Sequence, residues 1–91
     1  MDIQVRHNPE GQRFETNLDG RWAYLSYSFQ ADSVYFDHTF VPENFRGRGV
    51  ASALVRTGLE EARRQHWKIV PSCPYVAAFI QRHPEFADLV N

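Results

Sequence analysis

The sequence contains a single cysteine, Cys73, among its 91 residues. An internal disulfide is therefore excluded, and this cysteine usage is typical of a reducing compartment such as the cytoplasm. The cysteine and the four histidines show no paired spacing, so no metal site is predicted. No apolar run is long enough to cross a bilayer, and the N-terminus has no signal-peptide pattern. We expect a cytoplasmic domain that binds neither a metal nor a membrane.

The sequence also lacks an excess of either charge. Ten Lys and Arg residues stand against eleven Asp and Glu residues, which gives a formal net charge of -1. A nucleic-acid-binding domain usually carries a clear excess of basic residues, so nucleic acid is not an expected partner. No repeat or linker divides the chain, and its length suits one domain with a small core. We predict a single domain over residues 1–91.

Alternation of apolar and polar residues in the first half of the chain predicts four strands, over residues 3–7, 13–18, 21–29 and 34–41. Asp19-Gly20 is a strong hairpin signal between the second and third strands. In the fourth strand, strict alternation would place Phe36 and His38 on one face and Thr39 on the other. These strands are expected to form an antiparallel meander.

The second half of the chain predicts a helix, a strand and a second helix. Apolar residues recur at helical spacing from Val50 to Ala62. Gly58 within this stripe would let the helix approach the sheet closely, or it is only a local weakness of the helix. Residues 68–73 form a short apolar run, and Pro74 suits the first turn of a following helix. A strand–helix–strand passage places its two strands parallel. The predicted fold class is therefore α/β with a mixed α+β sheet, antiparallel first and parallel at the end.

The turn before the long helix carries no carboxylate, and none occurs from Phe45 to Leu59. The N-terminus of a helix normally favours acidic residues, because its free N–H groups and the helix dipole make that end positive. Here Arg46 and Arg48 occupy the start, with Gly47 and Gly49 between and after them. Such a turn can bind an anion through its backbone, or it can be a tight turn whose arginines face solvent.

Cys73 and His38 are the two candidates for chemistry. Both lie near the carboxyl ends of strands predicted to be parallel, which is where ligands bind in open α/β sheets. A free cysteine is usually a small buried hydrophobe, but one that precedes a helix can become a reactive thiolate. A histidine in a strand can be structural, or it can act as a general base near neutral pH. The residues alone leave these alternatives open.

The motifs around the turn resemble those of the GCN5-related N-acetyltransferases. Arg46-Gly47-Arg48-Gly49-Val50-Ala51 fits the family signature Arg/Gln-x-x-Gly-x-Gly/Ala, with a strand before it and an amphipathic helix after it. The stretch from His38 to Val90 is similar to a small single-domain subgroup of predicted acetyltransferases. The segments that carry this likeness are His38-Thr39-Phe40-Val41-Pro42, Pro71-Ser72-Cys73-Pro74 and His83-Pro84-Glu85-Phe86. The chain lacks the helices that full-size members carry between their first two strands, so the acceptor side is expected to be open.

The resemblance implies that acetyl-CoA is the cosubstrate. Backbone amides of the turn and helix start would hold its pyrophosphate, and the backbone of Phe40 and Val41 would pair with the pantetheine arm. The turn residues concerned are Arg46, Gly47, Arg48, Gly49, Val50 and Ala51. Cys73 and His38 match positions suspected of catalysis in the small subgroup. Cys73 would take the acetyl group or line the thioester pocket, and His38 would be the general base for the acceptor amine or for the thiol.

We therefore predict an N-acetyltransferase that transfers an acetyl group from acetyl-CoA to an amine acceptor. Direct attack by the amine is the common route in the family. The acceptor could be a small amine, a polyamine or a protein lysine, and the protein a monomer or homodimer. One alternative is a non-catalytic CoA or acyl-CoA sensor or interaction module. Another is a small adaptor that binds a protein through its aromatic strands.

Overall fold

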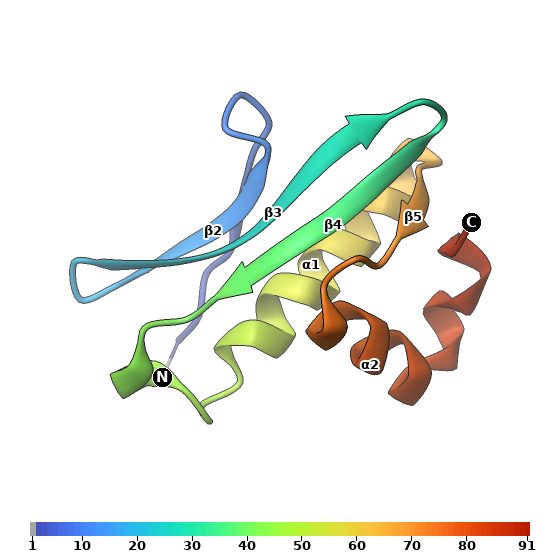
Figure 1. Cartoon of the computed structure of the whole chain (residues 1–91). Coiled ribbons are helices and arrows are strands. Elements are labelled where there is room, and N and C mark those ends of the chain that lie inside the picture. Colours follow the sequence, from blue (N-terminus) through green and yellow to red (C-terminus); the bar gives the residue numbers. More distant parts are fainter. Residues whose placement is uncertain (1) are drawn as a thin grey trace.

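The structure, a computed structural model, describes residues 2–91 and has a five-stranded sheet with its helices on one side (Figure 1). The strands follow the order β1-β2-β3-β4-β5 across the sheet. Their bounds are β1 Arg6–Asn8, β2 Arg13–Leu18, β3 Arg21–Gln30, β4 Ser33–Phe40 and β5 Lys68–Val70. The helices are α1 Val50–Gln65 and α2 Pro74–Arg82, with short 3-10 helices η1 Glu43–Phe45 and η2 Pro84–Leu89. None of the helices described in residues 2–91 is long and apolar enough to cross a membrane.

The predicted meander and parallel crossover are confirmed. Strands β1 to β4 pair antiparallel in sequence order, and β5 pairs parallel with β4. Asp19 and Gly20 form the β2–β3 turn with φ of 51° and 87°, as expected for a two-residue hairpin loop. Two strand boundaries differ from the prediction by more than one residue. The first strand begins at Arg6, and β5 ends at Val70 instead of reaching Cys73.

The predicted face alternation in β4 is wrong, because the strand contains a β-bulge. Tyr27 pairs with Phe36 and Ser26 pairs with His38, so Asp37 is an extra residue with no partner in β3. A bulge shifts the side-chain alternation by one residue. Phe36 and Thr39 therefore lie on the helix side of the sheet, the side of Leu25, while His38 and Phe40 lie on the opposite side.

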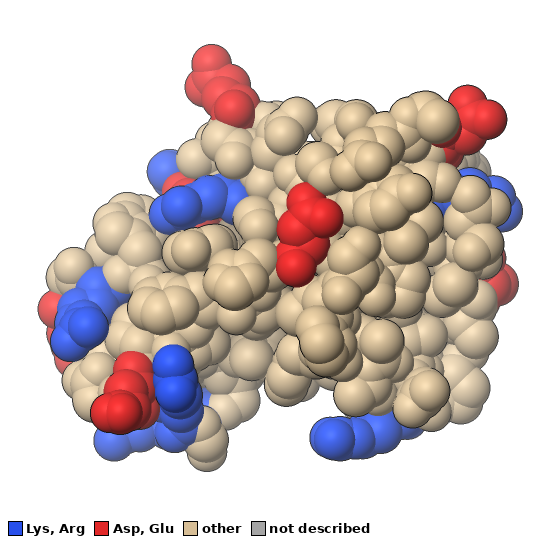
Figure 2. Space-filling view, in the orientation of Figure 1, with Lys and Arg blue, Asp and Glu red and all other residues tan. Residues whose placement is uncertain are grey.

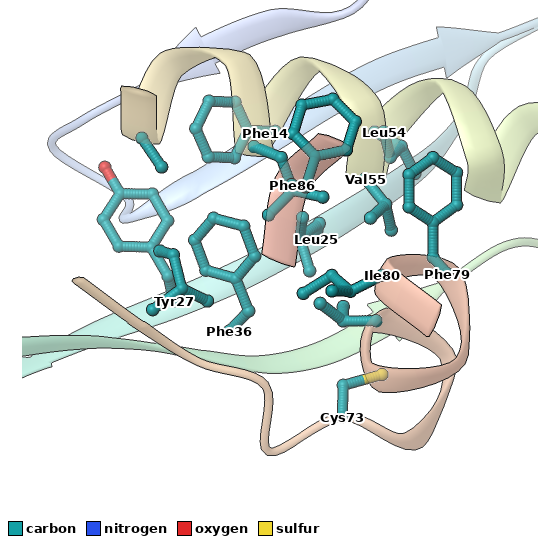
Figure 3. Packing of buried hydrophobic residues seen from close by; sticks show 14 of the residues in the cluster. Phe14, Leu25, Tyr27, Phe36, Leu54, Val55, Cys73, Phe79, Ile80 and Phe86 are labelled. Carbon is teal, nitrogen blue, oxygen red and sulfur yellow. The ribbon is translucent and has the colours of Figure 1, made fainter. Parts of the chain in front are cut away.

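Helix α1 packs directly on the sheet at Gly58, as the sequence predicted. A Cβ atom built on Gly58 would lie 3.0 Å from Leu25 Cδ2, 3.1 Å from Phe36 Cε2 and 3.3 Å from Phe14 Cδ2. Figure 3 shows these three core residues packed beneath α1, with Phe79 and Ile80 of α2 joining the same cluster. Both helices therefore cover one face of the sheet.

No helix among the described residues covers the other face, and strands β3 and β4 lie in front of α1 in Figure 1. Glu15 is buried at the centre of this side by the side chains of Arg6 and Arg13, whose Nε atoms each donate to it at 2.7 Å. Burial alone would raise the pKa of Glu15, but hydrogen bonds from Arg13, Arg6 and Asn8 lower it below its ordinary value. We call this surface, formed by the outward residues of β1 to β4, the bare face.

His7 ties the first strand to α1. Its ring stacks on Phe14 at 4.4 Å between centroids, and its Nε2 lies 2.6 Å from the Tyr27 hydroxyl oxygen. Its Nδ1 lies 3.9 Å from an oxygen of Glu61 in α1. Burial lowers the pKa of His7; the Glu61 carboxylate opposes this shift, and Arg64 adds to it.

This cluster predicts a specific acid sensitivity. The unfolded chain protonates His7 near its ordinary pKa of 6.5, whereas the folded chain binds that proton only at lower pH. The free energy of unfolding should therefore fall as the pH drops below about 6.5, because the unfolded state then holds more protons. Urea unfolding over a pH series should show a shallower loss in His7→Gln. The exposed His66→Asn variant should keep the parent slope, and equal slopes in parent and His7→Gln would contradict the prediction.

Candidate active site

A pocket of about 420 Å³ opens where the carboxyl end of β4 meets the start of α1. Its lining residues are Thr39, Phe40, Val41, Phe45, Arg46, Gly47, Gly49, Val50, Ala51, Ser52 and Tyr75. They come from β4, η1, the glycine-arginine turn, α1 and α2. Most of the exposed lining is apolar, and the start of α1 forms part of it, so the pocket suits a long ligand with one anionic part.

The pocket exists because β4 and β5 diverge. Their last paired residues are Tyr35 and Val70. One further backbone hydrogen bond follows, in which the Cys73 N–H donates to the Phe36 carbonyl at 2.9 Å. Within the described chain, β4 has no neighbouring strand on that side from Asp37 to Phe40. Backbone groups along this edge are therefore available to a ligand that lies beside β4.

The start of α1 presents unpaired backbone donors to this pocket. Gly49 caps the helix in the left-handed conformation, with φ of 82°, and no side chain caps the helix. The first helical bond runs from the Ala53 N–H to the Gly49 carbonyl at 3.0 Å. The N–H groups of Val50, Ala51 and Ser52 precede that bond, and these residues all line the pocket. No acidic residue lies in the first turn, so the positive end of the helix dipole is not neutralised there.

The two arginines of the turn have different positions. Arg46 lines the pocket, and its Nε donates to the Val41 carbonyl at 3.0 Å, which holds the turn against the end of β4. Arg48 lies outside the lining, with its guanidinium 5.8 Å from the centre of the Phe45 ring. Gly47 adopts φ of 80°, a conformation that favours glycine.

Cys73 lies just behind the pocket wall. Its side chain is buried, and its Sγ is 3.4 Å from Oγ1 of Thr39, which does line the pocket. Cys73 is also the N-cap residue of α2, and Figure 3 shows it at the beginning of that helix, beside the core. The thiol therefore lies next to the pocket, with Thr39 as the pocket residue in contact with it.

His38 lies on the bare face and is exposed. Its ring centre is 6.4 Å from that of Tyr24, and its carbonyl accepts a bond from the Ser26 hydroxyl at 3.4 Å. His38 is next to pocket residue Thr39 in sequence but points to the other side of the sheet. The structure therefore brings Cys73 close to the pocket and places His38 across the sheet from the thiol.

Comparison with known proteins assigns the fold and the family. A sequence model of a family described as GCN5-related N-acetyl-transferase matches residues 13–89. This chain belongs to that family. The resemblance seen in the turn motif is thus confirmed across most of the chain.

Several known proteins are similar to this chain over most of its length. Protein NATD1 from Gallus gallus is 29% identical over 85 residues, covering 90% of this chain and 77% of that protein. Protein NATD1 from Homo sapiens is 28% identical, covering 90% of this chain and 75% of that protein. An NMR structure of a GCN5-like protein from Staphylococcus aureus superposes with a TM-score of 0.75 at 23% identity. It covers 97% of this chain and 87% of that chain, which shows the shared fold.

The pocket of this GCN5-related acetyltransferase domain contains all the residues predicted to hold coenzyme A except Arg48. It also contains Thr39, Phe45, Ser52 and Tyr75, which sequence reasoning did not select. Ser52 could have been found from its place in the first turn of α1. Thr39 has no recognisable signal, because the bulge that sets its direction is not evident in the sequence, and Tyr75 reaches the pocket only through the packing of α2. In residues 2–91 no group of three His, Cys, Asp or Glu residues could hold a metal ion.

Proposed function

We propose that this domain binds acetyl-CoA in the pocket and transfers its acetyl group to an amine. The observation that carries the proposal is the acid-free start of α1, whose free N–H groups open into a pocket that continues along the unpaired edge of β4. The N–H groups of Val50, Ala51 and Ser52 would hold the pyrophosphate, assisted by the Arg46 guanidinium. The backbone of Phe40 and Val41 would pair with the pantetheine amides.

The reaction in this proposal is direct transfer. The acceptor ammonium first loses a proton, and its nitrogen then attacks the thioester carbonyl carbon. As the tetrahedral intermediate collapses, the carbon–sulfur bond breaks and the coenzyme A thiolate takes up a proton. The products are an N-acetylated amide and free coenzyme A. A backbone N–H near Val41 would stabilise the negative charge that forms on the carbonyl oxygen.

The positions of His38 and Cys73 favour separate roles. His38 is exposed on the bare face beside the unpaired edge of β4, where it would take the proton from an incoming amine. It lies across the sheet from Cys73 and is therefore badly placed to activate that thiol. Cys73, buried behind Thr39, would shape the thioester end of the pocket without forming a covalent bond.

A substitution of His38 tests its role as a base. His38→Gln should lower kcat by about 100-fold at neutral pH, which is typical for the loss of a general base. The affinity for acetyl-CoA should stay unchanged, because His38 does not line the pocket. Steady-state kinetics together with calorimetry of coenzyme A binding give both values. His66→Asn, a histidine change at the end of α1 opposite the pocket, is the matched control, and an unchanged kcat in His38→Gln would assign the base elsewhere.

The function itself is tested by binding and turnover. Acetyl-CoA at millimolar concentration should raise the Tm, since a ligand well above its Kd stabilises the fold. Transfer to a panel of amines should be detectable, and Cys73→Ala should keep most of that activity. Intact-mass spectrometry after incubation with acetyl-CoA alone should show no added acetyl group. An adduct that Cys73→Ala removes would establish a covalent route. Binding with no transfer to any amine would favour the non-catalytic coenzyme A module, and no thermal shift would overturn the proposal.

A further inference from the structure

The bare face has an aromatic patch that adjoins the pocket. Tyr24, His38 and Phe40 lie together on it, with ring centres 5.6 Å apart for Tyr24 and Phe40. Phe40 is partly exposed and also lines the pocket, so one side chain belongs to both surfaces. Trp22 extends the patch toward the β2–β3 hairpin and is 44% exposed. An antiparallel sheet with a free face usually presents polar residues to water, so these aromatic side chains need an explanation.

The charges on this face leave one carboxylate that no arginine neutralises. Arg6 and Arg13 both bind Glu15, and their guanidinium groups lie over the rings of Trp22 and Tyr24. Figure 2 shows the surface over the strands with its charged side chains mostly at the margins and one acidic side chain near the middle. Among the described residues of this face, Asp37 is the carboxylate without an arginine partner. It is exposed at the bulge, next to His38, and accepts a hydrogen bond from the Ser28 hydroxyl at 2.8 Å.

We infer that the bare face binds a polypeptide and presents one of its lysine side chains to the pocket. A lysine has a long apolar stem and a cationic end, which suit the partly exposed ring of Phe40 and, on the same face, the carboxylate of Asp37. The stem packs along Phe40 and Tyr24, and the ammonium pairs with Asp37 at the point where β4 and β5 diverge. His38, the next residue in β4, removes the proton before the nitrogen attacks the thioester. This inference rests on the proposed acetyl transfer and names its acceptor class.

The shape of the site favours a polypeptide over a small free amine. Small-molecule sites usually enclose most of their ligand, whereas the described residues form no wall above the bare face. Binding energy must then come from a wider contact, in which tryptophan and tyrosine side chains are the usual anchors. The patch from Trp22 to Phe40 supplies them beside the reaction site.

The experiment compares three acceptors with acetyl-CoA held saturating. They are an N-terminally acetylated peptide with one internal lysine between leucines, N-acetyl-lysine amide and spermidine. We expect kcat/KM for the peptide to exceed that for each small amine by about 10-fold or more, because only the peptide contacts the whole patch. Tyr24→Ala and Asp37→Asn should each raise the KM for the peptide by about 10-fold with little change in kcat.

Two control variants separate a local effect from a general loss of fold. Phe29→Ala removes an exposed aromatic residue from the other face of the sheet, and Asp32→Asn removes a carboxylate at the β3–β4 turn. Both should leave the peptide KM unchanged, and all four variants should keep the parent affinity for coenzyme A. If small amines react as well as the peptide, or if Asp37→Asn and Tyr24→Ala leave KM unchanged, the inference is overturned while acetyl transfer stands. If coenzyme A does not bind the parent protein, the proposed function fails first.

Discussion

Replacing Ser52 with glutamate is expected to weaken coenzyme A binding by about 1,000-fold while leaving the fold at least as stable. Ser52 lies in the first turn of α1 and lines the pocket. A carboxylate at a helix start is favoured by the dipole, typically by about 0.3–1 kcal/mol. The same carboxylate would repel the pyrophosphate by about 4 kcal/mol at a separation of ~4 Å in a partly polar environment. An acidic residue would thus stabilise this helix and exclude its proposed ligand.

Ser52→Gln is the matched control, because glutamine has nearly the size of glutamate without its charge. Calorimetry should show a modest loss of coenzyme A affinity for Ser52→Gln and a much larger one for Ser52→Glu. Urea unfolding should show that neither substitution destabilises the protein. Equal losses in the two variants would point to steric hindrance alone. Normal binding in Ser52→Glu would place the phosphates away from the helix start and would overturn the proposed site.

Gly58→Val should destabilise the fold by about 3 kcal/mol, the upper end of the usual cost of overfilling a core. Even the first added carbon would lie 3.0–3.3 Å from Leu25, Phe36 and Phe14, which are fully buried. The two further methyl groups would force α1 away from the sheet. In a chain of this length the Tm should fall by about 15 °C, which thermal unfolding followed by circular dichroism will measure.

Glu60→Val controls for the helical propensity of valine, since Glu60 is exposed on the same helix. That variant should lose only about 0.5 kcal/mol. A small loss in Gly58→Val would mean that the sheet and helix separate easily. The close contact at Gly58 would then not hold α1, and the pocket at its N-terminus, in place.

Local chemistry explains what could be predicted. The Asp19-Gly20 turn and the helix from Val50 follow from short-range preferences that neighbouring residues satisfy by themselves. The absence of carboxylates around Arg46 is likewise local, and it left an anion site at the helix start as one of two interpretations. Gly58 marked a close approach because it interrupts an apolar stripe with the smallest residue. These signals need no knowledge of distant contacts, so the sequence is enough to read them.

The arrangement of the site depends on contacts between distant segments. The bulge at Asp37 turns Thr39 toward the pocket and Cys73, and turns His38 onto the bare face. Simple alternation predicted that Phe36 and His38 share one face of the sheet. The extra residue that separates them becomes visible only when β4 is aligned with β3. Tyr75 reaches the pocket through the packing of α2.

The sequence by itself determined the order of the elements, the acid-free glycine-arginine turn and the family. The tertiary structure decided which residues share the pocket and on which side of the sheet His38 and Cys73 lie. The physical reason is that turns and helix starts depend on neighbouring residues, whereas the direction of a side chain in a bulged strand depends on its pairing with another strand.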